Sequence, residues 1–166
     1  LYISDRIGRN GETFRCIKFR TMHVGADSIR DDVIGDLDDE VADRYRDDPR
    51  VTRVGGVLRR WSMDELPQLF NVLGGSMSLV GPRPHAVAHN EHYRKVVSGY
   101  MLRHKVRPGI TGLAQINGLR GETRSVETMS RRVELDIEYV KNWSLGLDMR
   151  ILVKTLFVFL RDHRAY

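Results

Sequence analysis

The sequence of 166 residues contains a single cysteine, Cys16, which excludes an internal disulfide framework and suits a reducing compartment. Cysteine and histidine spacings typical of a zinc site are missing, as is the GxxxxGKS pattern of a phosphate-binding loop. No secretory signal peptide is visible. The first residue is Leu1 rather than methionine, so we expect the chain to be a fragment of a longer protein.

The composition is typical of one ordered domain, since 41% of the residues are hydrophobic and 30% are charged. The net charge of +5 is unevenly distributed: residues 27–48 hold ten acidic and three basic side chains, and the others carry 24 basic against 12 acidic. We interpret residues 27–48 as an exposed lid or spacer. The basic remainder favours phosphate ligands, nucleic acid or an anionic membrane surface, although a solvated basic face has the same composition.

Short-range patterns predict an N-terminal hairpin followed by helices. Asn10-Gly11 lies between runs rich in Ile, Phe and Thr, and this pattern predicts a β-hairpin over residues 1–22. A helix is expected from Gly55 and another over residues 85–104. Residues 106–118, which contain one proline and three glycines and lack a helical period, are expected to form a loop.

The clearest amphipathic helix is predicted over residues 125–142, where apolar residues recur at three- and four-residue spacing. Asp136 lies at the edge of that apolar stripe, three residues after Val133. Because a carboxylate beside a buried face needs a partner, Asp136 is predicted to orient an arginine or a lysine. The predicted fold class is α+β, mostly helical with a small N-terminal β-hairpin, in one domain over residues 1–166.

The last segment, residues 144–162, is strongly apolar but carries Asp148, Arg150 and Lys154. A membrane-spanning helix needs about 20 mostly uncharged residues, so this segment is not predicted to span a bilayer. It fits a core helix, which we favour, or a helix on a membrane interface whose basic side chains reach lipid phosphates.

Two adjacent carboxylates, Asp64 and Glu65, stand in the stretch Ser-Met-Asp-Glu before an apolar run. The stretch matches a capping box, in which Ser62 caps a helix and Glu65 reaches back to its amide. Pro67 makes that helix start irregular, however, because it lacks an N–H. Neighbouring side chains on a helix diverge by about 100°, so both acids cannot serve the cap.

Basic residues near the two acids suggest chemistry rather than capping alone. Arg59 precedes the acids, and Arg83 follows them between two prolines that fix its backbone. An arginine presented in this way suits bidentate phosphate recognition. A carboxylate can act as a nucleophile toward phosphorus, and a second carboxylate can hold a divalent cation. The residues therefore support a phosphoryl-transfer hypothesis.

The sequence resembles the bacterial sugar transferases, the monotopic polyprenyl-phosphate glycosyl-1-phosphate transferases, of the exopolysaccharide type. The resemblance is carried in family order by KFRTM (18–22), DPRVTRVGGVLRRWSMDELPQLFNVLGGSMSLVGPRP (48–84), KVRPGITGLAQING (105–118) and ELDIEYVKNWSLGLDMRILVKT (134–155). It implies transfer of a sugar 1-phosphate from a UDP-sugar, favouring UDP-glucose or UDP-galactose, to undecaprenyl phosphate. UMP would be released, and Mg²⁺ is the implied cofactor.

The resemblance also implies roles for single residues. Asp64 would be the nucleophile that takes the phosphosugar covalently, and Glu65 would help it hold the metal. Arg59 and Arg83 match phosphate-contacting positions. Three further residues are expected to line the site, namely Lys18, Arg107 and Asp136.

The family's hydrophobic re-entrant helix does not occur in this chain, which we therefore expect to be the cytosolic globular part of a monotopic membrane enzyme. The expected location is the cytoplasmic face of the bacterial inner membrane, with the membrane surface as a partner and a homodimer as one assembly that the sequence allows. Two alternatives differ in class: a nucleic-acid-binding module and a non-catalytic fragment that scaffolds a glycan-assembly complex. No nucleic-acid partner is expected, because the aromatic residues lie largely within apolar runs.

Overall fold

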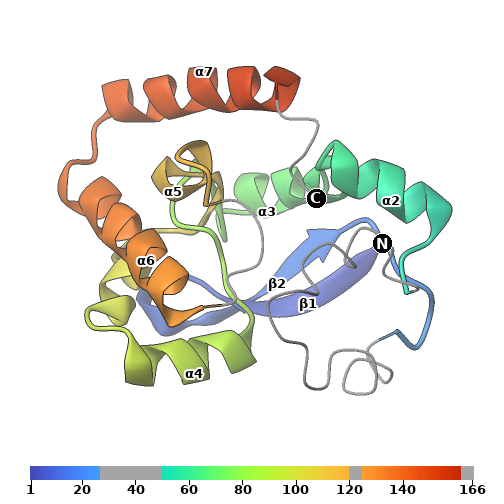
Figure 1. Cartoon of the computed structure of the whole chain (residues 1–166), viewed down its shortest axis with the longest axis horizontal. Helices are drawn as coiled ribbons and strands as arrows, with labels where there is room; N and C mark the ends of the chain where they lie inside the picture. The colour runs from blue at the N-terminus through green and yellow to red at the C-terminus, as the bar shows by residue number, and fades with distance from the viewer. Residues whose placement is uncertain (27–49, 120–124, 162–166) are drawn as a thin grey trace.

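The computed structural model describes residues 1–26, 50–119 and 125–161, and excludes the side chains of 159–161 (Figure 1). The acidic segment that we interpret as a lid or spacer lies outside the described residues. The architecture is α+β, with a small antiparallel hairpin at the N-terminus followed mainly by helices, which confirms the predicted fold class.

The hairpin consists of β1 (Tyr2–Ile7) and β2 (Thr13–Lys18), paired so that Tyr2 faces Lys18 and Ile7 faces Thr13. A 3₁₀ turn, η1 (Arg9–Gly11), connects the strands. Asn10 and Gly11 adopt positive φ angles of 58° and 81°, which these two residue types tolerate best. The predicted hairpin and its turn are confirmed.

A second, parallel pair of strands is formed by β3 (Ser78–Val80) and β4 (Gly109–Thr111). Glycines allow their ends to approach, since a Cβ on Gly109 would collide with the Gly81 backbone. The expectation of a loop over residues 106–118 was therefore wrong, because β4 and the short helix α5 (Leu113–Ile116) lie within it. Both elements are too short to give a recognisable period.

Helix α2 (Arg53–Arg60) begins two residues before the predicted Gly55, because the Thr52 side chain caps it by accepting from the Gly55 N–H at 2.9 Å. The helix predicted over residues 85–104 was wrong as one element. It divides into α4 (Val87–Val96) and the 3₁₀ helix η4 (Tyr100–Lys105), and Gly99 between them has a φ of 71° that a helix cannot accommodate.

The predicted amphipathic helix is confirmed as α6 (Val126–Lys141). Its buried Met129 and Val133 pack against Tyr93 of α4, Val97 at the C-terminal cap of α4, and Tyr100 of η4. In Figure 1 the hairpin crosses the middle of the molecule, with α4 below it and α2 and α3 (Gln68–Leu73) above it.

The C-terminal helix α7 (Leu145–Arg161) has one buried face and one exposed face. Ile151 is fully buried in a cluster with Val80 and Tyr139. Leu156 and Phe157 are 63% and 60% exposed. The prediction that residues 144–162 form a core helix is therefore correct for only one face of α7. Within the described residues, every helix is too short or too polar to cross a bilayer.

Helix α3 is attached to the outer edge of β2 through Asn71. The Asn71 side chain accepts a hydrogen bond from the Ile17 N–H at 3.0 Å and donates one to the Arg15 carbonyl at 2.7 Å. These are the backbone groups that a third strand would pair with. Two residues after Ile17 along the chain, the Phe19 N–H donates to the Asp64 carbonyl at 2.9 Å. The edge of β2 thus determines where Asp64 lies.

Replacing Asn71 by alanine is expected to lower the free energy of unfolding by about 1 to 3 kcal/mol, because it leaves two part-buried bonds to the β2 backbone unmade. The measurement is the melting temperature of the full-length protein. Asn117→Ala serves as the control, since the Asn117 amide donates to the Leu113 carbonyl at an exposed position. Equal melting temperatures for the two variants would contradict this role of Asn71.

Candidate active site

Asp64 and Glu65 lie on the 3₁₀ turn η3 (Met63–Glu65), between α2 and α3. The predicted capping box was wrong: Ser62 has a left-handed φ of 47° and its side chain makes no capping hydrogen bond to the turn. The regular helix α3 begins only at Gln68, with Pro67 at its N-cap, so Ser62 is too far from the helix start. The Glu65 carboxylate, which the box assigned to the Ser62 amide, points elsewhere.

Two basic side chains from different parts of the chain hold the Glu65 carboxylate. Lys18 Nζ lies 2.7 Å from Oε1, and Arg83 bonds both oxygens, with its Nη2 at 2.6 Å from Oε1 and its Nη1 at 3.0 Å from Oε2. Burial alone would raise the pKa of Glu65, but the charges and hydrogen bonds of Arg83 and Lys18 outweigh it and hold the pKa far below its ordinary value. Glu65 is therefore a permanent anion at neutral pH.

Asp64 is half-buried and differs from its neighbour. Among the contacts between described residues, none is a hydrogen bond or an ion pair of the Asp64 carboxylate, although its backbone carbonyl is bonded to Phe19. Burial, followed by the adjacent Glu65 charge, raises the pKa of Asp64, against the opposing charges of Lys18, Arg59 and Arg83. A carboxylate in this setting is available to a ligand and is more basic than a solvated one.

Arg59 comes from the last turn of α2, and its Nε donates to the Thr21 hydroxyl at 2.9 Å. Helix α2 lies close to this residue, since a Cβ on Gly55 would overlap the Thr21 carbonyl. The guanidinium is thereby oriented at the site, where its charge acts on Asp64.

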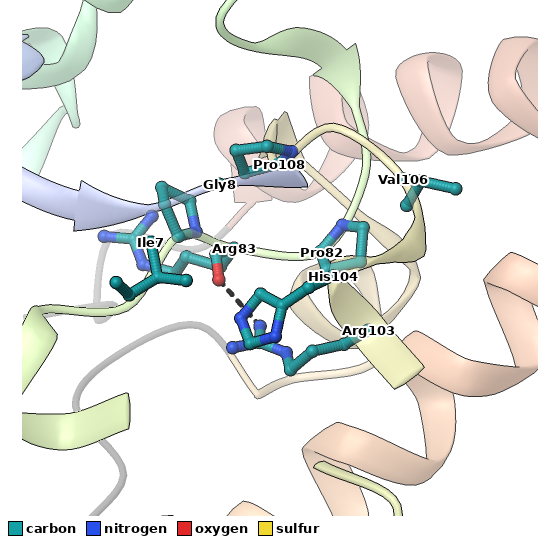
Figure 2. A pocket seen from close by; sticks show the side chains of 9 residues that line it. Ile7, Gly8, Pro82, Arg83, Arg103, His104, Val106 and Pro108 are labelled. Carbon is teal, nitrogen blue, oxygen red and sulfur yellow. Dashed lines mark hydrogen bonds between the residues drawn. The ribbon is translucent and has the colours of Figure 1, made fainter. Parts of the chain in front are cut away.

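Arg83 belongs to a turn whose backbone is held by several elements. The Gly109 N–H donates to the Pro82 carbonyl at 2.9 Å, and the Ile7 N–H donates to the His85 carbonyl at 3.1 Å. Between them, Arg103 Nη2 donates to the Arg83 carbonyl at 2.7 Å, the bond drawn as a dashed line in Figure 2. Arg83 and Arg103, with His104, also line a small pocket on this side of the turn (Figure 2).

The structure brings five of the predicted site residues together: Lys18, Arg59, Asp64, Glu65 and Arg83. Asp136 is not beside the carboxylate pair. It is 1% exposed and lies 2.8 Å from Arg103 Nη2, which confirms that it orients an arginine. Arg107 is exposed, and within the described residues no hydrogen bond or ion pair joins it to the pair.

Sequence reasoning missed three residues that support the site: Thr21, Asn71 and Arg103. The sequence pointed indirectly to Arg103 alone, because Asp136 on a buried face required a basic partner. The pattern did not say which basic residue that partner is. Thr21 and Asn71 act through contacts with residues 38 and 56 positions away, which no local pattern reports.

The arrangement can bind and attack a phosphoryl group. Three cations surround a half-buried carboxylate, and cations placed in this way stabilise the oxygens of a phosphoryl group during displacement. The two carboxylates also have unused acceptor sites that could bind a divalent cation. Glu65 uses about three of the roughly four acceptor sites of a carboxylate on Lys18 and Arg83, and both Asp64 oxygens remain.

The family model described as bacterial sugar transferase matches residues 1–162 of this chain. The chain belongs to the bacterial sugar transferase family. It is 51% identical over its whole length to a UDP-glucose:undecaprenyl-phosphate glucose-1-phosphate transferase of Escherichia coli (strain K12), of which the alignment covers 34%. A protein of the same name from Caulobacter vibrioides is 47% identical, with 100% of this chain and 58% of that protein covered.

A third member of the family, the UDP-galactose-lipid carrier transferase of Erwinia amylovora, is 41% identical over 100% of this chain and 34% of its own length. The chain thus spans between about one third and three fifths of the length of these three relatives. It corresponds to a part that they share, while other parts of them have no counterpart in the chain.

Glu65→Gln is expected to lower the melting temperature of the full-length protein near neutral pH. The loss of melting temperature should be smaller in acid. The folded-state pKa of Glu65 lies below its ordinary value of 4.5, so its contribution to stability is complete above about pH 4.5 and declines as the pH falls further. The difference in melting temperature between wild type and variant should therefore narrow below that pH. The exposed Glu12 provides the control variant Glu12→Gln. A difference that widens in acid would contradict the assignment.

Proposed function

We propose that the protein containing this chain transfers a sugar 1-phosphate from a UDP-sugar to undecaprenyl phosphate, releasing UMP. The family and the names of its relatives support this reaction and favour UDP-glucose, with UDP-galactose as the second candidate. The observation that carries the proposal is the asymmetry of the acidic pair. Glu65 is held by Lys18 and Arg83, whereas the adjacent Asp64 carboxylate has no such partner among the described residues.

In the first step, an Asp64 carboxylate oxygen attacks the phosphorus that carries the sugar. A bond forms between that oxygen and phosphorus, the bond from phosphorus to the oxygen of UMP breaks, and UMP leaves with the electron pair. In the second step, an oxygen of undecaprenyl phosphate attacks the same phosphorus. The diphosphate bond forms, the acyl phosphate bond breaks, and the Asp64 carboxylate is regenerated.

The basic residues have distinct roles in this proposal. Arg83 and Arg59 bind the phosphate oxygens, for which the planar guanidinium is well suited. Lys18 pairs with Glu65 at 2.7 Å and adds positive charge beside Asp64. Since Glu65 remains an anion, it keeps Lys18 and Arg83 in position before the substrate binds.

The donor set also fits Mg²⁺, which takes oxygen ligands and is usually held by one or two carboxylates together with substrate phosphates. Asp64 and the remaining acceptor capacity of Glu65 would hold the ion. When bound, it would neutralise charge on the phosphate oxygens. Within the described residues no third acidic, histidine or cysteine side chain joins the pair as a ligand, so the substrate phosphates and water would complete the coordination.

We also propose that exposed apolar side chains of α3 and α7 rest on the cytoplasmic surface of the membrane. Phe70 and Leu73 are 67% and 84% exposed, and Leu156 and Phe157 are more than half exposed. Both helices contact β3 and lie in the upper half of Figure 1. Large exposed apolar side chains mark membrane or protein contacts when they gather on one surface, and this placement would bring the site to the level of the lipid phosphate.

Asp64→Asn in the full-length protein is expected to abolish UMP release, because the amide cannot form the acyl phosphate. The measurement is UMP release from UDP-glucose with undecaprenyl phosphate and Mg²⁺. Intact-protein mass spectrometry without the acceptor should detect a hexose phosphate adduct on the wild type only. Asp5→Asn, an exposed acid on β1, should retain both signals. Turnover near the wild-type rate by Asp64→Asn would refute the covalent role.

The double variant Leu156→Ser/Phe157→Ser is expected to reduce kcat/KM at least about fivefold for undecaprenyl phosphate in anionic vesicles, because it removes about 1 kcal/mol or more of apolar burial. With a short-chain, water-soluble polyprenyl phosphate the same variant should match wild type. Val24→Ser provides the control, since Val24 is 88% exposed and lies outside α3 and α7. Equal losses with both acceptors would indicate damage to the site instead of lost membrane contact.

A further inference from the structure

Arg103 is among the largest fully buried side chains of the described structure, yet it does not contact the carboxylate pair. We propose that it is a positioning residue, which fixes the backbone of Arg83 so that the Arg83 guanidinium is held toward Glu65 and the substrate phosphates. This inference rests on the proposed function and adds a residue to its machinery.

Two prolines, Pro82 and Pro84, flank Arg83 in the sequence. The peptide unit between Arg83 and Pro84 contains the Arg83 carbonyl but no N–H, because proline lacks one. Its carbonyl is therefore the one group through which a backbone hydrogen bond can fix the plane of that peptide. Arg103 Nη2 donates to it at 2.7 Å.

Two nearby peptide units, Pro82–Arg83 and His85–Ala86, are held by other elements. The Pro82 carbonyl accepts from Gly109 in β4, and the His85 carbonyl accepts from Ile7 in β1. Backbone amides provide those two bonds, whereas Arg83 depends on a side chain. Without Arg103, the Arg83 carbonyl would lose the hydrogen bond that it accepts from Nη2 at 2.7 Å.

The guanidinium of Arg103 is itself held on every side. Nε donates to Asp136 Oδ2 at 2.9 Å, and Nη1 lies 2.6 Å from His85 Nδ1. Since arginine is only a donor, His85 Nδ1 must accept. A lysine has a single nitrogen at its tip and cannot reach Asp136, His85 and the Arg83 carbonyl in this geometry.

Stability alone gives a weak reason for such a pair. The side chains of Arg103 and Asp136 are 1% and 2% exposed, and desolvating two charges offsets most of the attraction that they gain. Apolar residues of similar volume would fill the space at lower cost. The geometry points to orientation of Arg83 as the feature that the pair provides.

The test is a double-mutant cycle on the full-length protein, combining Arg103→Lys with Arg83→Lys. Arg103→Lys should lower kcat/KM for UDP-glucose about tenfold in the wild-type background. In the Arg83→Lys background, where the bidentate group is already lost, it should lower kcat/KM about twofold or less. Equal losses in both backgrounds, or no loss in the wild type, would overturn the proposal.

A control for general destabilisation is Tyr139→Phe, which removes a hydroxyl that donates to Asp148 at 2.8 Å and to the Val80 carbonyl at 3.3 Å, in the cluster of Val80, Tyr139 and Ile151. It should lower the melting temperature and leave kcat/KM within about twofold of wild type. If Arg103→Lys does not fold, the pair Arg103→Gln/Asp136→Asn removes both charges together and leaves neither unpaired. That pair is expected to give the same dependence on Arg83, and losses independent of Arg83 would overturn the proposal.

A readout that does not need activity separates this inference from the proposed function. The guanidinium resonances of Arg83, assigned by their loss in Arg83→Lys, should shift in Arg103→Lys and remain unchanged in Tyr139→Phe. If the wild type released no UMP from any UDP-sugar, the proposed function would fail while this shift would still support the positioning role. Unchanged Arg83 resonances in Arg103→Lys would overturn it.

Discussion

The buried ion pairs of Glu65 join three segments that are distant in the sequence. Lys18 and Arg83 stand 47 and 18 residues from the carboxylate that they share, and the Glu65 side chain is 9% exposed. Removing either cation would leave a buried charge less well compensated, which is far more costly than losing a surface ion pair. The hairpin, the 3₁₀ turn and the proline-flanked turn therefore assemble as a unit, and the site exists only when all three are in place.

The edge of β2 provides the surface on which this unit is built. A two-stranded hairpin is marginally stable alone, and its open edge exposes backbone donors and acceptors. Here the Asn71 side chain and the Asp64 carbonyl satisfy that edge. The contacts that stabilise the hairpin also attach the Asp64 backbone to Phe19, the residue that follows Lys18. Folding and site geometry therefore depend on a shared set of hydrogen bonds.

Those dependencies explain which features the sequence could predict. The hairpin, the amphipathic helix and the need of Asp136 for a basic partner follow from local patterns, because turn residues, helical period and the cost of a buried charge act within a few residues. The capping box predicted for the Ser-Met-Asp-Glu stretch was wrong because contacts with distant residues decide its structure. Its local pattern fits a cap, but Lys18 and Arg83 offer Glu65 charged partners that outweigh a single amide. Similarly, Gly99 ended a helix that propensity would have continued.

The two adjacent carboxylates, Asp64 and Glu65, have pKa values shifted in opposite directions, which suggests different roles for them. Burial and the charge of Glu65 raise the pKa of Asp64, whereas Arg83 and Lys18 lower that of Glu65 despite its deeper burial. Pairs whose environments separate their pKa values commonly have different roles in catalysis. The more basic oxygen is the better nucleophile, and the permanent anion is the better anchor for cations. If Glu65 were instead the nucleophile, it would have to break three hydrogen bonds before it could attack, and those bonds hold the cations that the proposed phosphate transfer requires. The local electrostatics therefore favour the proposed roles, with Asp64 as the attacking group and Glu65 as its support.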